Sequence, residues 1–362
     1  MLSDINESDF LKAYLMEIEY YSKILGDITV NTIFFGGGTP SLMSVEFLGA
    51  ILDKIQNVFN VKDGAEISLE VNPTTIEANK FREFRRLGIN RLSIGVQSLA
   101  DKYLRFFRRT HTRKGVLEAI AVAQECFEDN YSIDLIYARP NQTISEWLGE
   151  LEEAVELSPN HISLYQLTIE PETEFGRTGV RTADDGVASE MYGLTNEFLE
   201  SKNIPLYEVS NYAKKGWECR HNLNYWNSGQ WLGIGAGAHS RLCFKNEFVD
   251  GYKPRTAVEN IKNPVQWQLN TLKFGHGSSS RTNLTKNEFM EEILLMGLRM
   301  RCGIDINNVK KYLNLYSNNI REILNDNYKF LSEERYIEVS SDSIRIPLDH
   351  FNILDSIVER VI

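Results

Sequence analysis

The run Thr32–Ser41 holds residue types suited to binding a polar ligand. An apolar stretch ends in three glycines, which include Gly37 and Gly38, and the chain then turns through Thr39 and Pro40 toward a helix with one apolar face. Because glycine has no Cβ, a ligand can approach the backbone N–H groups directly. A glycine-rich turn between strand and helix is typical of sites for anionic groups. It also occurs where a strand and a helix only pack tightly, so the sequence leaves both interpretations open.

Further polar residues lie in, or at the ends of, the next predicted strands. These residues are Glu70, Gln97, Asp134 and Thr168, and predicted helices separate the strands that carry them. Short strands of nearly continuous apolar character indicate a parallel sheet covered by helices. The ends of such strands converge on one cavity in a closed or partly closed barrel, whereas a doubly wound sheet concentrates its site at one switch point. Polar groups on successive strands favour the barrel. The predicted strands are Thr32–Phe35, Glu66–Val71, Arg91–Val96, Ser132–Tyr137, His161–Thr168 and Leu206–Ser210.

The pattern changes after residue 244, where a smaller, mainly helical α+β domain is predicted. The expected division is a barrel over residues 1–244 and a winged-helix-type domain over residues 245–362. Within the second part we expect helices over Asn287–Met300, Ile306–Leu313, Ile320–Asn325 and Asn352–Val361, and a hairpin from Tyr336–Val339 and Ser343–Pro347.

Composition bounds the class of protein. The 362 residues carry a net charge of −11, from 39 basic and 50 acidic residues, which argues against a nucleic-acid-binding surface. No apolar run reaches the length of a membrane span and no signal-peptide pattern is present, so we expect a cytoplasmic protein. The four cysteines, Cys126, Cys219, Cys243 and Cys302, are far apart in sequence, and no pair has the spacing of a zinc or iron–sulfur loop.

Ordered motifs along essentially the whole chain resemble a known family. The first set resembles radical S-adenosylmethionine proteins of the oxygen-independent coproporphyrinogen oxidase family: Phe35–Ser41, Glu70–Pro73, Arg91–Ser98, Arg109–His111, Asp134–Tyr137 and Leu167–Pro171. A second set is similar to the HemW branch, whose members act as haem chaperones: Tyr207–Ala213, His221–Trp226 and Gly233–Ser240. The resemblance implies an α/β fold, a partial TIM-like (β/α) radical S-adenosylmethionine barrel, followed by a HemN-like C-terminal domain.

The resemblance also implies the contacts of S-adenosylmethionine. Backbone groups near the glycines would hold its methionine end, and a carboxylate would bind its amine or a ribose hydroxyl. The implied residues are Gly37, Gly38, Thr39, Glu70, Gln97, Arg109, Asp134, Thr168 and His239. Without the resemblance, Glu70 and Asp134 are equally well explained as ion-pair partners of Arg91 or Arg109. One departure is Arg108, which stands where the family has a glycine and could crowd the backbone beside Arg109.

A haem site is implied at His221, Asn222 and Tyr225, with His221 as the expected ligand of the haem iron. Imidazole is a good axial ligand and a phenolate can also serve. Tyr225 and Trp226 could cover porphyrin faces, and Cys219 is a further candidate ligand or attachment point. The alternative is that His221 and Asn222 form a hydrogen-bonded pair that only holds a loop.

The cluster motif of the superfamily is absent from this chain. The family binds a 4Fe–4S cluster through three cysteines in a C-x3-C-x2-C loop that precedes the glycine-rich turn, because thiolates bind iron and tune its potential. Here a helix predicted over Asp9–Ile24 is followed directly by the strand that leads to the glycines, so we expect no 4Fe–4S ligands in this chain. We therefore expect either a start site placed too late, with the cysteines upstream, or a catalytically silent truncated relative. The missing strand would also expose a sheet edge.

The leading functional prediction is a haem chaperone that binds haem and passes it to an acceptor protein, with any membrane contact made through that acceptor. S-adenosylmethionine is the second expected ligand, and a 4Fe–4S cluster is expected only if an upstream segment exists. The enzyme alternative is oxygen-independent coproporphyrinogen III oxidase, which needs the cluster. A third alternative is a binding module for a nucleotide-like ligand without a redox role.

Overall fold

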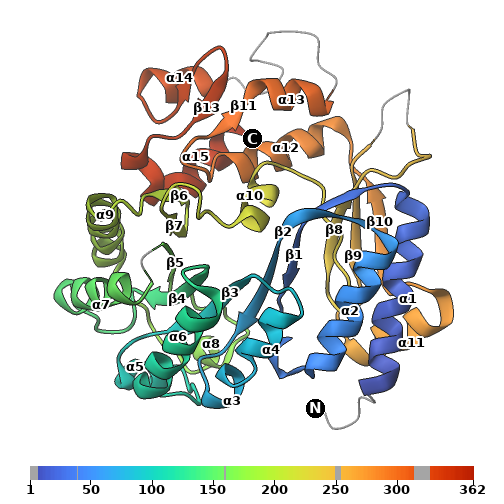
Figure 1. Cartoon of the computed structure of the whole chain (residues 1–362). Coiled ribbons are helices and arrows are strands. Elements are labelled where there is room, and N and C mark those ends of the chain that lie inside the picture. The colour runs from blue at the N-terminus through green and yellow to red at the C-terminus, as the bar shows by residue number, and fades with distance from the viewer. Residues whose placement is uncertain (1–6, 39, 159, 249–253, 314–326) are drawn as a thin grey trace.

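The central element of the fold is a curled, mostly parallel β-sheet (Figure 1). The computed structural model describes residues 7–38, 40–158, 160–248, 254–313 and 327–362, and within them seven strands pair in the order β1-β2-β3-β4-β5-β7-β6. β1 to β5 are parallel, and the short β6 and β7 form an antiparallel end. Among the described residues β1 and β6 are edge strands, so the sheet is an open half-barrel and the predicted partial barrel is confirmed. The strands are β1 Thr29–Phe35, β2 Asn60–Val71, β3 Arg91–Gln97, β4 Tyr131–Tyr137, β5 His161–Gln166, β6 Leu206–Glu208 and β7 Asn211–Ala213.

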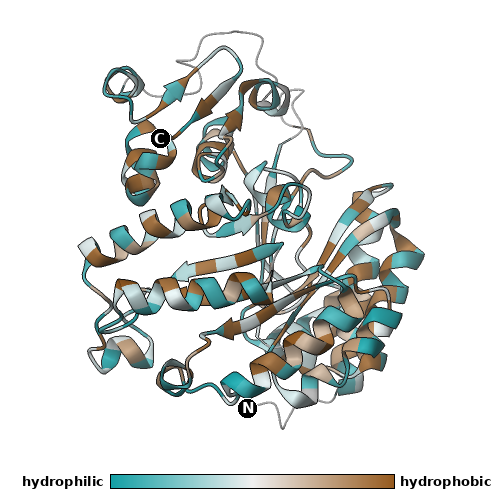
Figure 2. Ribbon diagram, turned by 60° about the vertical axis from the view of Figure 1, so that its left-hand side comes forward, coloured by the Kyte–Doolittle hydropathy of each residue, from teal (hydrophilic) through white to brown (hydrophobic). Residues whose placement is uncertain are grey.

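Helices follow the parallel strands and cover one face of the sheet (Figure 1). Their starts follow the sequence: Ser44 caps α2, and Thr143 forms a capping box with Glu146 at the start of α7. Figure 2 shows that these helices alternate between hydrophilic and hydrophobic residues, as amphipathic helices do. They are α2 Val45–Val58, α3 Thr75–Ala78, α4 Phe81–Arg86, α5 Asp101–Phe106, α6 Arg113–Phe127, α7 Ile144–Leu157, α8 Glu174–Arg177 and α9 Asp185–Ser201; a 3-10 turn, η1, spans Pro40–Leu42.

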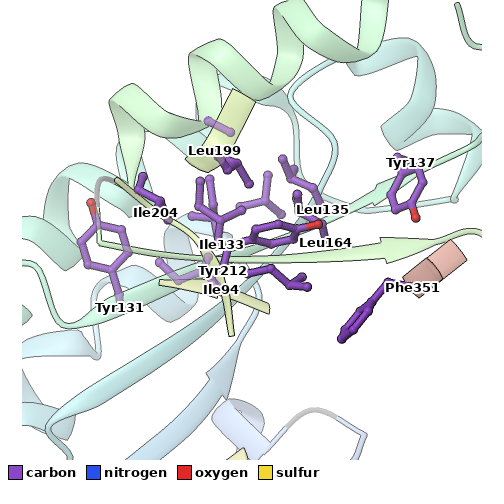
Figure 3. Packing of buried hydrophobic residues seen from close by; sticks show 14 of the residues in the cluster. Ile94, Tyr131, Ile133, Leu135, Tyr137, Leu164, Leu199, Ile204, Tyr212 and Phe351 are labelled. Atoms are coloured by element: carbon purple, nitrogen blue, oxygen red, sulfur yellow. The ribbon is translucent and has the colours of Figure 1, made fainter. Parts of the chain in front are cut away.

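The main hydrophobic core lies between this sheet and its helices and continues into the C-terminal part. Ile94, Ile133 and Leu164 of three neighbouring strands pack in one buried cluster with Leu199 of α9 and with Phe351, which comes from the C-terminal part (Figure 3). A shared core of this kind couples the stability of the two parts.

A second layer consists of α1 (Glu7–Leu25), α11 and an antiparallel sheet of order β10-β9-β8. Glu17 of α1 is fully buried and accepts hydrogen bonds from the backbone N–H groups of Gly235 and Gly277, at 2.9 and 2.7 Å, and from Trp267 Nε1 at 3.1 Å. Each of these donors thus has a carboxylate oxygen as its acceptor, and the hydrogen bonds fix α1 to this layer. Its elements are β8 His239–Leu242, β9 Thr256–Asn260, α11 Pro264–Phe274 and β10 Ser278–Asn283.

The C-terminal part follows the predicted order of helices and a small hairpin. Its elements are α12 Lys286–Gly297, β11 Ile304–Asp305, α13 Ile306–Leu313, α14 Tyr328–Glu333, β12 Glu338–Val339, β13 Ser343–Arg345, η3 Leu348–Ile353 and α15 Leu354–Val361. The predicted helix Ile320–Asn325 lies outside the described residues. The predicted domain boundary at 244/245 falls between β8 and β9, which pair with each other, and the division at this point stays a prediction.

Two details differ from the sequence-based expectations. The single strand predicted over Leu206–Ser210 is the first arm of the β6–β7 hairpin. The β8–β10 sheet was not predicted. Its strand β10 consists of Ser278–Asn283, which is polar throughout and offers no apolar alternation to recognise.

Candidate functional site

The glycine-rich loop after β1 is folded against Glu70 of β2. The backbone N–H of Gly37 donates a hydrogen bond to Glu70 Oε2 at 3.1 Å. A Cβ on Gly36 would lie 2.8 Å from the Phe34 ring and 2.9 Å from Glu70 Oε1, so only glycine fits there. Gly37 and Gly38 have φ of +79° and +72°, and a Cβ on either would meet nothing within 4 Å. The loop is therefore closely packed on its Gly36 side and open at the next two residues. Thr39 lies outside the described residues.

Asp134 of β4 brings a second carboxyl to the same part of the sheet. Neighbouring strands place Glu70 beside Ser93 and Asp134 beside Ser163, and Ser93 donates a hydrogen bond to Asp134 Oδ2 at 2.8 Å. Burial raises the pKa of Asp134 despite this hydrogen bond. Burial also raises the pKa of Glu70, and the nearby charge of Asp134 adds to that shift while the Gly37 N–H opposes it.

Neither carboxyl forms a direct ion pair in the described part of the chain. The ion pairs of Glu70 or Asp134 with Arg91 or Arg109, weighed as the alternative explanation, do not form, although the positive charge of Arg91 acts on Asp134 and opposes the rise of its pKa. Arg91 itself donates to Asn130 Oδ1 and to the backbone carbonyl of Trp217, at 3.4 and 3.5 Å. The two carboxyls are thus desolvated acids without a directly paired cation, an arrangement suited to a ligand that carries positive charge or hydroxyl groups.

The other residues expected near this ligand are placed less closely together. Gln97 ends β3 with φ of +67°, an uncommon backbone conformation for a residue other than glycine, at an irregular step of the β3–β4 register. Thr168 is exposed two residues after β5. His239 starts β8 in the second layer, where its Nδ1 lies 3.9 Å from Glu259 Oε1; among the described residues no hydrogen bond or ion pair joins it to Glu70 or Asp134.

Arg108, which stands where the family is expected to have a glycine, adopts a backbone conformation that favours glycine. Its φ is +53°, in the left-handed region, and its exposed guanidinium pairs with Glu174 at 2.7 Å. The side chain thus points to solvent and crowding is avoided at the cost of a left-handed residue. Arg109 is exposed, and its backbone N–H donates to the Leu104 carbonyl at 2.9 Å.

His221 lies on α10 (Arg220–Trp226), and both of its ring nitrogens have partners. Nδ1 lies 2.9 Å from Thr32 Oγ1 of β1, and Nε2 lies 2.9 Å from the Tyr225 hydroxyl one helical turn later. The ring stacks on Phe34 with centroids 5.0 Å apart and an interplanar angle of 22°. Burial lowers the pKa of His221 to about 4, so the imidazole is neutral at neutral pH.

Glu66 of β2 fixes the start of this helix. Its buried carboxylate accepts hydrogen bonds from the backbone N–H groups of Arg220 and His221, at 3.1 and 3.0 Å, and lies 3.5 Å from Cys219 Sγ. A carboxylate at a helix N-terminus satisfies N–H groups that have no partner within the helix. The Arg220 guanidinium also donates to the Asn31 carbonyl at 2.9 Å, so α10 is tied to both β1 and β2.

These contacts correct part of the haem prediction. His221 does hold its segment in place, as the alternative proposed, but through Thr32 and Tyr225; among the described residues no hydrogen bond joins it to Asn222. Burial raises the pKa of Cys219 to about 11, which keeps its sulfur a protonated thiol and disfavours it as an iron ligand.

Thr32, Phe34 and Glu66 are the residues of this region that sequence reasoning missed. Glu66 carried a signal, because a charged residue in an apolar strand must find a partner when it is buried. Thr32 and Phe34 carried no such signal, because the partner of both is His221, which lies 189 residues after Thr32.

Tyr225 connects α10 to the C-terminal part. Its ring makes an edge contact with Trp231 at 4.7 Å, and both line a narrow cleft together with Arg241 and Phe289. Arg241 pairs with Glu292 of α12 at 2.7 Å. Burial raises the pKa of Tyr225, so its hydroxyl remains protonated.

The cysteines of this chain do not fit an iron–sulfur cluster. In the described ranges Cys219 is buried, Cys126 and Cys243 are partly buried and Cys302 is exposed, and no group of three or more His, Cys, Asp or Glu residues is placed to hold a metal ion. Among the same residues, no helix is long and apolar enough to span a membrane.

Comparison with known proteins agrees with the geometry. The family model of the Radical SAM superfamily matches residues 6–154, and that of the HemN C-terminal domain matches residues 284–348. The chain is 31% identical to the Heme chaperone HemW of Buchnera aphidicola subsp. Acyrthosiphon pisum, over 98% of this chain and 90% of that protein. The chain belongs to the HemW-like family of radical SAM proteins. It is also 32% identical to the mitochondrial Radical S-adenosyl methionine domain-containing protein 1 of Danio rerio, over 99% of this chain and 81% of that protein.

A solved structure supports the fold of this HemW-like chain. Coproporphyrinogen III oxidase (HemN) from Escherichia coli superimposes with a TM-score of 0.80 over 98% of this chain and 82% of that one. Their sequence identity is 20%, so the likeness concerns the fold. It agrees with the predicted partial barrel and helical C-terminal part.

Proposed function

We propose that this chain binds haem at α10, with the neutral imidazole of His221 as the iron ligand, and passes the haem to an acceptor protein. The relatives named as heme chaperones support the choice of ligand. The observation that carries the site is the setting of the His221 ring, which stacks on Phe34 and has a hydroxyl 2.9 Å from each nitrogen. Burial also lowers its pKa to about 4, so at neutral pH a ring nitrogen keeps the lone pair that iron needs. Tyr225 and Asn222 lie on the same helix and would contact the porphyrin.

The open end of the half-barrel would bind S-adenosylmethionine. This ligand carries an ammonium group, a sulfonium group and ribose hydroxyls, and the described residues fit it because Glu70 and Asp134 are desolvated carboxyls that form no direct ion pair among those residues. Glu70 would accept from the ammonium group or a ribose hydroxyl, and the open backbone at Gly37 and Gly38 would receive the methionine end. Thr39, Gln97, Arg109, Thr168 and His239 stay candidates for the same ligand. Because the cysteines of this chain do not fit a 4Fe–4S cluster, the proposal contains no radical step.

A haemin titration tests the haem site. We expect haemin added to the purified chain to give a Soret band shifted from that of free haemin, and His221→Ala to remove or shift this band. His276→Ala is a matched control, because His276 also packs against an aromatic ring, that of Tyr20, and forms a hydrogen bond with a hydroxyl, that of Ser278. The control should titrate like the parent protein. An unchanged Soret band in a folded His221→Ala variant would remove this site.

A further inference from the structure

Both ring nitrogens of His221 are already engaged, which bears on how iron could reach the ring. We propose that Thr32 fixes the tautomer of His221 by accepting a hydrogen bond from Nδ1–H, and that the Tyr225 hydroxyl occupies the Nε2 lone pair until haem displaces it. This inference rests on the proposed function and names two residues that control the same site, one as a positioning residue and one as a competitor of the iron.

The positions of the two hydroxyl groups are set by different elements. Thr32 lies in β1, where it pairs with Glu66 of β2, and Glu66 in turn holds the start of α10. Tyr225 lies on α10 itself, four residues after His221. Stacking on Phe34 keeps the imidazole in one plane, so each nitrogen faces one hydroxyl only. Each hydroxyl lies 2.9 Å from its nitrogen, a normal hydrogen-bond distance.

The acidity of the two hydroxyl groups selects the tautomer. A neutral imidazole has one N–H donor and one acceptor nitrogen, and the partner of one nitrogen decides which of them carries the proton. A phenol is a far stronger acid than an aliphatic alcohol and is the better donor. Tyr225 O–H therefore donates to Nε2, and Nδ1–H donates to Thr32 Oγ1. In this arrangement the lone pair suited to iron is on Nε2, under the tyrosine hydroxyl.

Tyr225 is the partner that can leave. Its side chain lines a cleft beside Trp231, whereas Thr32 is held within a paired strand. When iron binds, the O–H···Nε2 hydrogen bond breaks and the Fe–Nε2 bond forms with the same lone pair, so no proton leaves the ring. The Nδ1–H···Thr32 hydrogen bond remains and orients the imidazole, as second partners of metal-bound histidines do.

This exchange suits a protein that must release its cargo. Haem affinity is lowered by the strength of the hydrogen bond that iron replaces, and the Tyr225 hydroxyl can recapture Nε2 when haem moves to an acceptor. Since a net hydrogen bond changes an equilibrium by roughly two- to tenfold, the competition tunes the affinity without abolishing binding.

The first test reads the tautomer without haem. Nitrogen NMR of the haem-free protein, with labelled histidine assigned through His221→Ala, should show Nδ1 protonated and Nε2 unprotonated. In Thr32→Val this preference should weaken, and Thr32→Ser should restore it because serine keeps the hydroxyl. A protonated Nε2 in the parent protein would overturn the proposal, whatever the protein binds.

The second test measures haemin affinity. Tyr225→Phe keeps the ring but removes the competing hydroxyl, so the affinity should rise by roughly two- to tenfold. Thr32→Val should lower it and Thr32→Ser should not. An unchanged haemin affinity in Tyr225→Phe would overturn the competitor role. A weaker affinity would also overturn it, because it would show that the Tyr225 hydroxyl contacts the haem. If His221→Ala binds haemin like the parent protein, the proposed haem site fails, while the NMR result on the tautomer stands separately.

Discussion

The barrel mouth and the α10 segment lie close together but treat their polar groups in opposite ways. At the mouth, Glu70 accepts one backbone hydrogen bond, from Gly37, and neither Glu70 nor Asp134 forms a direct ion pair among the described residues, although the charge of Arg91 acts on Asp134. On α10, Glu66 accepts two backbone hydrogen bonds, and both nitrogens of His221 have partners. A ligand at the mouth would supply what the protein lacks, whereas a ligand at α10 must replace a bond that already exists.

Phe34 joins the two regions physically. Its ring stacks on the imidazole of His221, and atoms of the same ring limit the space at Gly36, where Glu70 approaches. The difference between the regions therefore does not arise from distance. It arises from the residue types that the neighbouring strand β2 supplies: Glu66 faces helix N–H donors, and Glu70 faces an open loop.

The largest predicted effect tests the paired region. Glu66→Ala would leave the backbone N–H groups of Arg220 and His221 without an acceptor in a buried position and would remove the cap of α10. We expect unfolding to become easier by roughly 3–5 kcal/mol, measured by urea denaturation. Asp63→Ala, at an exposed position of the same strand, is the control and should change little. A loss below about 1 kcal/mol would show that α10 is not held by Glu66.

The next effect concerns Glu208 of β6, which is fully buried and accepts hydrogen bonds from Ser210 N–H and the Asn211 amide. Burial raises its pKa from 4.5 to about 7. The folded protein thus holds a proton that the unfolded chain has lost, so stability should fall as pH rises from about 4.5 to about 7, by about 3 kcal/mol in total, and then level off.

Glu208→Gln should remove this fall, because the amide cannot ionise. The measurement is the free energy of unfolding at several pH values for the parent protein and the variant. Glu83→Gln, which changes an exposed carboxyl, should keep the parent profile. Identical pH profiles for the parent protein and Glu208→Gln would refute the buried neutral acid.

A smaller effect, opposite in sign to that of Glu66→Ala, is expected at the mouth. Burial and the charge of Asp134 raise the pKa of Glu70, so its ionisation is a cost that grows as pH rises through the folded pKa. Glu70→Gln keeps an oxygen for the Gly37 N–H but removes the charge. At neutral pH it should stabilise the protein slightly while weakening S-adenosylmethionine binding. Thermal unfolding measures the first effect; a destabilised variant would break the comparison between the two regions.

The smallest effect concerns Arg108, beside the mouth. Its φ of +53° costs less for glycine than for arginine, and its ion pair with Glu174 is exposed. Arg108→Gly should therefore be neutral or stabilise the protein by up to about 1 kcal/mol. Glu174→Gln removes the same ion pair but keeps the left-handed arginine, and should not stabilise. Equal melting temperatures shifted downward in both variants would show that the ion pair outweighs the backbone strain.

How far the sequence could predict these regions depends on how local the information is. The alternation of strands and helices, the glycine-rich turn and the acidic residues of β2 and β4 are local features, and the structure confirms the open half-barrel that they predict. The partners of His221 could not be predicted, because Thr32 comes from a strand 189 residues earlier. The same holds for Glu17, whose carboxylate meets Gly235 and Gly277 only after the chain has folded.

The second layer could not be predicted, because part of it has the polar sequence expected of a loop. Strand β10 pairs with β9 through backbone groups, with exposed serine and threonine side chains that show no apolar alternation. The replacement of a family glycine by Arg108 was visible in sequence, but its outcome, a left-handed arginine with its side chain in solvent, required the coordinates.

The central claim is that α10 carries a haem site distinct from the S-adenosylmethionine site at the mouth. The most direct measurement compares two ligands with two variants: haemin followed by its Soret band, and S-adenosylmethionine followed by calorimetry, each with His221→Ala and Glu70→Gln. Haemin binding should be lost in His221→Ala and kept in Glu70→Gln, and S-adenosylmethionine binding should show the reverse. Haemin binding that survives in His221→Ala, or that is lost in Glu70→Gln, would contradict the claim.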